Sequence, residues 1–143
     1  KLEWYALRWK IEVFHKVMKS GCRAEEARLE TAERLTKFLA LIAMVSWRIF
    51  FLTMSARAKQ EVAPETALTP TEIATLDAID AARTKPRILR KNLSTYLLQI
   101  AMLGGYLARN HDPPPGNMVI WRGLTRLNDI VFGLSIGTRP RCG

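Results

Sequence analysis

Apolar residues recur at helical spacing along most of the chain. The first such stretch is 4–19, where the apolar positions are three or four residues apart: Leu7, Ile11, Phe14 and Met18. That spacing places them on one face of a helix. Neither Gly nor Pro interrupts 4–19, and Gly21 follows where a helix-ending residue is expected. The pattern predicts a helix that packs by one side.

A second, longer helix is predicted over 32–58, with Thr31 as its N-cap. It contains an apolar stretch of 17 residues, 38–54, which is close to the minimum for a membrane span. Arg48 interrupts that stretch past its middle, and a charge there is costly in a bilayer. We therefore expect a helix buried in a layered domain, because it is apolar all round. A membrane-associated basic helical protein is the less favoured alternative.

A third helix is predicted after the polar linker 59–69. Thr69 and Glu72 have the spacing of a capping box, and Pro70 occupies the first helical position. This helix is expected to end at about Ala81.

Two more helices complete the predicted secondary structure. One begins at Asn92 or Ser94 and runs to about Arg109, and it carries closely spaced small residues at Ala101, Gly104, Gly105 and Ala108. Such residues allow another helix to approach closely, although the two glycines also permit a local break. Three prolines exclude a helix from 111–117. The last helix is predicted over 119–134, with an apolar stripe of Trp121, Leu124, Leu127, Val131 and Leu134. No convincing β-strand appears, so the predicted fold class is mainly α.

The positive charge is concentrated in the second half of the chain. Residues 1–81 carry 12 basic and 11 acidic side chains, whereas 82–143 carry 10 and 2, a net of +8. Such a segment is suited to a polyanion, with nucleic acid the first choice. The basic loop 83–91 contains three candidate contacts to a DNA backbone, Arg87, Arg90 and Lys91, or it only aids solubility. The two cysteines, far apart and without a metal-binding spacing, indicate a reduced cytosolic protein.

The chemistry is concentrated on a second face of the first helix. Tyr5, Arg8, Glu12 and Lys19 fall within an arc of about 60° at 3.6 residues per turn. Glu12 could hold a divalent metal. Arg8 and Lys19 could bind phosphates, with Lys16 as a further backbone contact, and Tyr5 could bond to a phosphate or stack on a base. The alternative without a binding function is a solvated helix face with local ion pairs.

This polar spacing resembles a known signature. Tyr, two residues, Arg, three residues, Glu, six residues and Lys is the pattern of the IS-four group of bacterial cut-and-paste transposases. The run RWKIEVFHKVMKSG, 8–21, is similar to the Tn-five branch of that group. Weaker similarity continues in LTPTE at 68–72, LGGY at 103–106 and WRGLTRLNDIVFG at 121–133.

The resemblance implies an RNase H-like fold with an Asp-Asp-Glu active site, in which Glu12 is the third carboxylate and a metal ligand. Tyr5, Arg8 and Lys19 would then contact transposon-end DNA. Residues 1–58 would be the C-terminal part of the catalytic domain, and 59–143 a small helical dimerisation domain. The implied cofactor is Mg²⁺ or Mn²⁺, two ions of which assist in-line attack at phosphorus.

The resemblance also implies partners. Transposases of this group act as homodimers in the cytoplasm, without a membrane, which would place Trp121 and Leu124 at the subunit interface. The alternative is that these two side chains pack inside their own domain. Because the motif supplies one of three carboxylates, a second hypothesis is a truncated, inactive dimerisation and DNA-binding remnant that interferes with full-length transposase.

Overall fold

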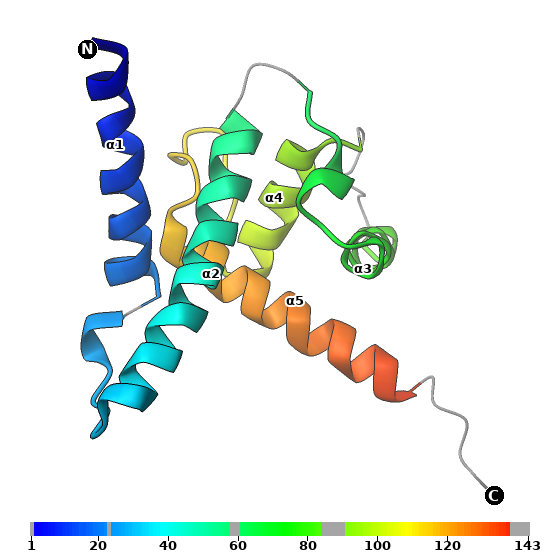
Figure 1. Cartoon of the computed structure of the whole chain (residues 1–143). Helices are drawn as coiled ribbons and strands as arrows, with labels where there is room; N and C mark the ends of the chain where they lie inside the picture. The colour runs from blue at the N-terminus through cyan, green and yellow to red at the C-terminus, as the bar shows by residue number, and fades with distance from the viewer. Residues whose placement is uncertain (1, 23, 58–60, 84–90, 138–143) are drawn as a thin grey trace, which may run out of the picture.

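The computed structural model describes residues 2–22, 24–57, 61–83 and 91–137, without the side chains of residues 2, 3, 6, 20, 21 and 56. In these ranges the chain forms five α-helices and three short helical turns, with no β-strand (Figure 1). The α-helices are α1 (Leu2–Lys16), α2 (Ala32–Arg57), α3 (Pro70–Ala81), α4 (Leu93–Leu103) and α5 (Asn117–Gly137). The turns are Val17–Gly21, Ala24–Glu26 and Pro64–Thr66. The mainly α prediction is confirmed.

One hydrophobic core joins the helices. Helices α4 and α5 pack most extensively against each other, α2 packs on α4, and α1 lies beside α2 (Figure 1). Fully buried side chains come from the turn Val17–Gly21 and from α2, α3, α4 and α5, namely Val17, Ile49, Leu52, Leu76, Tyr96, Ile100, Ile120 and Leu127. Both predicted segments, 1–58 and 59–143, contribute to this core, and their division into two domains stays a prediction.

Two glycines allow the backbones of α4 and α5 to touch. A Cβ on Gly123 would lie 1.9 Å from the carbonyl oxygen of Ile100, and one on Gly104 would lie 2.0 Å from that of Val119. Both distances are too short for any side chain, so the crossing requires glycine on each side. The predicted close approach at the small residues of this helix is therefore confirmed for Gly104.

The prediction that this helix continues to Arg109 is wrong, because α4 ends at Leu103. The Tyr106 N–H donates to the Ala101 carbonyl and the Gly105 N–H to the Met102 carbonyl. With Gly105 at φ +99, this is the left-handed Schellman ending that glycine favours. The local break at 104–105 thus closes the helix.

The capping predictions are confirmed. The Thr69 hydroxyl accepts a hydrogen bond from the Glu72 N–H, and the Glu72 carboxylate accepts one from the Thr69 N–H. Asn92 caps α4 by accepting from the Thr95 N–H, and Thr31 caps α2 by accepting from the Arg34 N–H. These local signals set three helix starts within a residue of the expected position.

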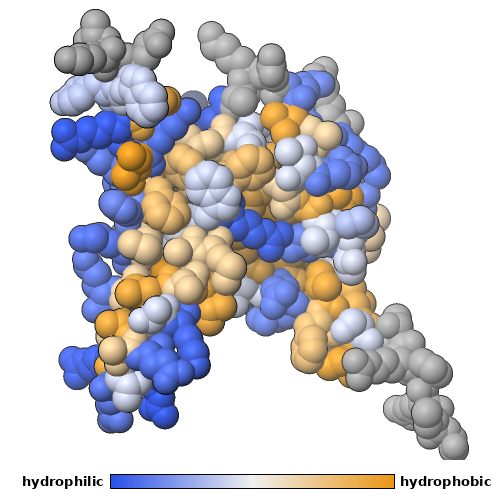
Figure 2. Space-filling view, viewed as in Figure 1, coloured by the Kyte–Doolittle hydropathy of each residue, from blue (hydrophilic) through white to orange (hydrophobic). Residues whose placement is uncertain are grey.

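The prediction that α2 is buried all round is wrong. Its buried side chains include Ser46, whose hydroxyl donates to the Cys22 thiol, and Ile49 and Leu52. Its remaining surface exposes large apolar side chains, namely Leu35, Leu39, Leu41, Met44 and Trp47. Figure 2 shows hydrophobic surface along α2. The reason is geometric, because the described helices cover only part of the surface of a helix this long. By length and composition Ala32–Ser55 could cross a membrane, which is weak evidence, since helices of soluble proteins also pass that test.

Helix α1 does not run unchanged to Lys19. It ends at Lys16 and passes into a π-helical turn, Val17–Gly21, whose last residue is Gly21. Phe14 packs edge-on against Phe50 of α2 at a ring distance of 6.4 Å, as the apolar stripe predicted. Leu7 and Ile11 of the same stripe are exposed, because α2 diverges from this end of α1 (Figure 1).

Candidate nucleic-acid interface on helix α1

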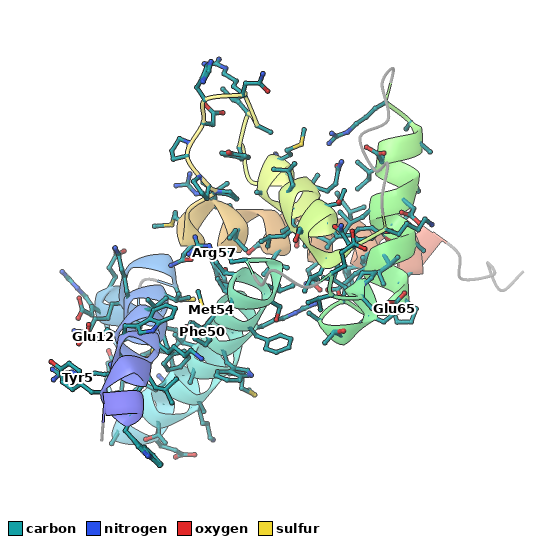
Figure 3. All side chains as sticks on the ribbon, turned by 90° about the horizontal axis from the view of Figure 1, so that it is seen from above. Tyr5, Glu12, Phe50, Met54, Arg57 and Glu65 are labelled. Carbon is teal, nitrogen blue, oxygen red and sulfur yellow. The ribbon has the colours of Figure 1, made fainter. Side chains whose placement is uncertain are left out.

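The polar face of α1 brings Tyr5, Arg8 and Glu12 together. The Arg8 Nε atom lies 3.3 Å from Glu12 Oε1, and the Arg8 guanidinium lies 5.8 Å from the centre of the Tyr5 ring. With Trp9, these residues line an open hollow of about 240 Å³. Figure 3 shows Tyr5 and Glu12 projecting from the side of α1 away from α2. The face is therefore available to a large partner.

The internal pairing of this face is easily replaced. The Arg8 and Glu12 side chains are 63% and 65% exposed, and an exposed pair four residues apart on a helix contributes only about 0.2–0.5 kcal/mol. A phosphate approaching Arg8, or a cation approaching Glu12, can thus break the pair at little cost. The geometry is compatible with a surface that binds nucleic acid and equally with a solvent-exposed helix face that has only local ion pairs.

Lys19 is placed differently from the other three. It lies in the π-helical turn, and its Nζ atom lies 2.9 Å from Glu25 Oε1. The wider turn changes the angle between successive side chains. The position of Lys19 therefore does not follow from the even spacing of 3.6 residues per turn that was used to predict it. The structure joins Lys19 to the segment after the helix, and its DNA contact stays a prediction.

The described residues alone do not form a metal centre. No group of three or more His, Cys, Asp or Glu side chains among them is placed to hold an ion. Glu12 offers a single carboxylate, and its neighbour in the structure is a cation, Arg8. A divalent ion generally requires several oxygen ligands, so this part of the chain supplies at most one protein ligand.

The remaining candidates are spread over the molecule. Lys91 forms an ion pair of 2.7 Å with Asp77 of α3, whereas Arg87 and Arg90 lie outside the described residues. Leu124 belongs to the core, and Trp121 is partly buried against it. Both side chains therefore contact the core of their own chain, and their place at a subunit interface stays a prediction.

A buried polar network links α3 to α4 behind Lys91. The Tyr96 hydroxyl donates to Asp77 at 2.7 Å, and the Gln99 amide donates to Asp80 at 3.1 Å. Burial alone would raise the pKa of Asp77, but the hydrogen bonds from Lys91 and Tyr96 outweigh it and lower that pKa. Burial, followed by the neighbouring Asp77, raises the pKa of Tyr96. This network fixes helix positions and faces no cavity that we identify in the described part of the chain.

Sequence reasoning missed two arginines of α2. Arg48 donates two hydrogen bonds to the Glu72 carboxylate of α3, at 2.6 and 2.7 Å. Arg57, at the end of α2, lines a groove with Lys16 of α1. Neither partner could be found from spacing, because both are more than twenty residues distant along the chain.

The comparison with known families agrees with the chemistry of α1. Residues 1–48 match the family model described as transposase DDE domain. The matched segment, about a third of the chain, includes all of α1, the π-helical turn and much of α2. This match supports a transposase-related function, for which DNA is the implied partner and a divalent metal the usual cofactor.

Proposed function

We propose that this chain is the C-terminal portion of an Asp-Asp-Glu transposase of the IS-four group, close to its Tn-five branch, with Glu12 as one of three catalytic carboxylates. The observation that carries the proposal is the exposed Tyr5–Arg8–Glu12 face within the segment that matches the transposase DDE domain. The parent enzyme would cut transposon ends and join them to target DNA in the bacterial cytoplasm. Residues 1–58 would complete its RNase H-like domain, and 59–143 would form a dimerisation domain.

The roles of the α1 side chains follow from their chemistry. Glu12 would supply one oxygen ligand to Mg²⁺ or Mn²⁺, with the other carboxylates coming from outside this sequence. Arg8 can grip a backbone phosphate with two parallel hydrogen bonds, and Lys16 and Lys19 can act as point charges. The Arg8 guanidinium lies over the Tyr5 ring. Tyr5 can stack on a base or donate a hydrogen bond to a phosphate. Lys91, Arg87 and Arg90 would add backbone contacts.

The proposal is tested by Glu12→Gln in a full-length transposase that carries this sequence. The change keeps the side-chain shape and removes the charge, so metal-dependent strand cleavage should be lost while binding to transposon-end DNA is largely retained. Glu33→Gln is the matched control, because Glu33 also forms an exposed pair with a cation four residues away, Lys37. Cleavage assays and gel-shift titrations of both variants give the answer. Cleavage by Glu12→Gln at the rate of Glu33→Gln would refute the role of Glu12.

A second candidate is an inactive remnant that binds DNA and full-length subunits. It is favoured by one observation, that the motif supplies a single carboxylate of the three the chemistry needs. The reading frame upstream of Lys1 separates the two, because a frame that supplies the other two carboxylates supports the transposase and a frame without them supports the remnant.

Dimerisation belongs to the proposal. Of the two residues expected at the interface, Leu124 lies in the chain's own core and Trp121 is partly buried against it. The exposed apolar side chains of α5 are instead at its other end, Phe132, Leu134 and Ile136. These side chains, which lie within or just after the segment 121–133 that resembles the family, are the surface we assign to a second subunit.

A further inference from the structure

Three aromatic side chains line an open hollow between α1 and α2. The Phe14 ring of α1 lies edge-on to Trp47 and Phe50 of α2, with 6.4 Å between ring centres in each pair. Trp47 and Phe50 lie 5.7 Å apart, and Figure 3 shows Phe50 on α2 beside α1. The hollow has a volume of about 300 Å³ and is lined by Lys10, Ile11, Phe14, Trp47 and Phe50. Among these lining residues Lys10 alone is charged.

The hollow is open to solvent although its lining is apolar. Trp47 is 57% exposed and Ile11 is 59% exposed. Apolar surface left in water forgoes about 25 cal/mol per Å², and Trp is among the residues that contribute most to protein interfaces. The hollow is therefore suited to receive an apolar side chain from a partner.

The outer end of α5 carries an apolar side chain of suitable shape. Phe132 and Ile136 are exposed, and Asp129 lies on the same face of the helix, three residues before Phe132 and seven before Ile136. Figures 1 and 3 show this end of α5 far from α1, on the other side of the molecule. It therefore does not fill the hollow of its own chain, but it is available to the hollow of a second copy.

The charges beside the two surfaces are complementary. Lys10 and Asp129 are both exposed, and neither has an oppositely charged partner among the residues that the structure describes. Lys10 precedes Phe14 by about 6 Å along α1, and Asp129 precedes Phe132 by about 4.5 Å along α5. When Phe132 of one copy enters the hollow of another, Asp129 thus comes within reach of the long Lys10 side chain.

We infer that the end of α5 of one copy docks in the hollow between α1 and α2 of a second copy, with Phe132 among the aromatic rings and Asp129 against Lys10. The inference rests on the dimerisation in the proposed function and names the surface that α5 meets. An aromatic side chain buries about 150–250 Å², whereas a stable interface buries about 1,200–2,000 Å². A single docked helix end therefore falls short. Because each copy has one hollow and one α5 end, a two-fold axis forms the contact twice and closes the dimer.

The test uses sedimentation velocity of the whole 143-residue chain at several protein concentrations and at low salt. The variants are Lys10→Asp, Asp129→Lys and Trp47→Ala, together with an equimolar mixture of the first two. The matched control is Arg34→Asp, which makes the same change of charge at an exposed residue of α2, about 20 Å from Trp47 along the helix. Circular dichroism verifies that each variant retains its helical content.

Lys10→Asp and Asp129→Lys should each weaken the dimer about tenfold, because like charges then meet in both contacts. Trp47→Ala should weaken it at least about tenfold through the lost aromatic contact, and Arg34→Asp should leave it unchanged. The mixture of Lys10→Asp with Asp129→Lys should regain the wild-type dimer, because opposite charges then meet in each contact. Recovery in the mixture is expected only when the two residues face each other across two different copies.

Two results would overturn the docking. One is a dimer that Phe132→Asp abolishes but that Lys10→Asp and Trp47→Ala leave intact, since α5 would then meet another surface, such as α5 of its partner; the proposed dimerisation would stand. The other is a mixture that remains as weak as its two components, which would separate Lys10 from Asp129. A wild-type chain that stays monomeric at every concentration overturns both the docking and the dimerisation.

Discussion

At the scale of single residues, two groups of described polar side chains differ in their burial. Those on α1 are exposed and weakly paired, and are thus available to a partner. Those between α2, α3 and α4 are partly or wholly buried, and no buried polar side-chain atom in the described part lacks a hydrogen-bond partner. Glu72 is the centre of the second group: its carboxylate is shared by Arg48 of α2 and by the Thr69 cap of its own helix.

The pKa of Glu72 predicts a pH-dependent stability. Burial alone would raise this pKa, but the hydrogen bonds from Arg48 and Thr69 outweigh it and hold it below its ordinary value of 4.5. A carboxylate with a lowered pKa in the folded state stabilises the fold above its unfolded pKa. That contribution is lost as the pH falls through the folded value. Acidification below about pH 4.5 should therefore weaken the link between α2 and α3.

Glu72→Gln tests this prediction. The variant should lose about 1–2 kcal/mol of unfolding free energy at pH 7, a value that allows for the partly exposed Arg48. It should also lose less stability than the wild type when the pH falls from 7 to 3, because the titrating group is gone. Urea unfolding at both pH values measures the two effects, with the exposed Glu33→Gln as control. Parallel pH profiles for wild type and Glu72→Gln would contradict the assignment.

At the scale of elements, the crossing of α4 and α5 is the tightest contact that we find. Gly104 belongs to the capped end of α4 and Gly123 to the middle of α5, and each lies against the backbone of the other helix. Glycine in a helix is disfavoured by about 1 kcal/mol relative to alanine. Here that local cost is offset by the burial of Ile100, Ile120 and Leu127 around the crossing.

Two substitutions within α5 separate the cost of glycine in a helix from the benefit of the close contact between α4 and α5. Gly123→Ala should destabilise the chain by about 1–3 kcal/mol or more, because the new methyl group would collide with the Ile100 carbonyl. Gly133→Ala, in the same helix with no atom within 4 Å of the added carbon, should stabilise by about 0.5–1 kcal/mol. Thermal and urea unfolding of the pair provides the measurement. A stabilising Gly123→Ala would mean that the two helices do not meet as described.

At the scale of the whole molecule, α5 projects beyond the core, and its outer end is apolar (Figure 2). Phe132 is 65% exposed, and Leu134 and Ile136 are exposed beside it. Adjacent apolar side chains on a protruding helix are typical of an interaction surface. We therefore propose this end of α5 as the subunit contact, in place of Trp121 and Leu124 near its start.

Phe132→Asp should weaken self-association without unfolding the chain, because the side chain lies outside the core. Leu107→Asp is the control, since Leu107 is similarly exposed in the loop after α4. Sedimentation velocity at several protein concentrations should show a concentration-dependent dimer for the wild type and for Leu107→Asp, and its loss for Phe132→Asp. A wild type that is monomeric throughout would remove the dimerisation proposal.

Much of this structure could be predicted from the sequence. The mainly α fold, the caps at Thr31, Thr69 and Asn92, and the juxtaposition of Tyr5, Arg8 and Glu12 depend on residues only a few positions apart. Interactions of that range are set by helical geometry and by side-chain bonds to the nearest backbone groups. They do not depend on how the helices are arranged.

Only the tertiary structure decided which surfaces are buried. The apolar composition of α2 predicted burial on all sides, yet burial requires a partner on each side, and α4 and α5 cover one. The pairing of Arg48 with Glu72 and the meeting of Lys16 with Arg57 join residues that sequence spacing cannot relate. The π-helical turn, which contains Lys19 and the buried Val17, also could not be predicted from the even helical spacing. Local patterns determine helices and their ends, whereas the choice of contacts between helices is made by packing over the whole chain.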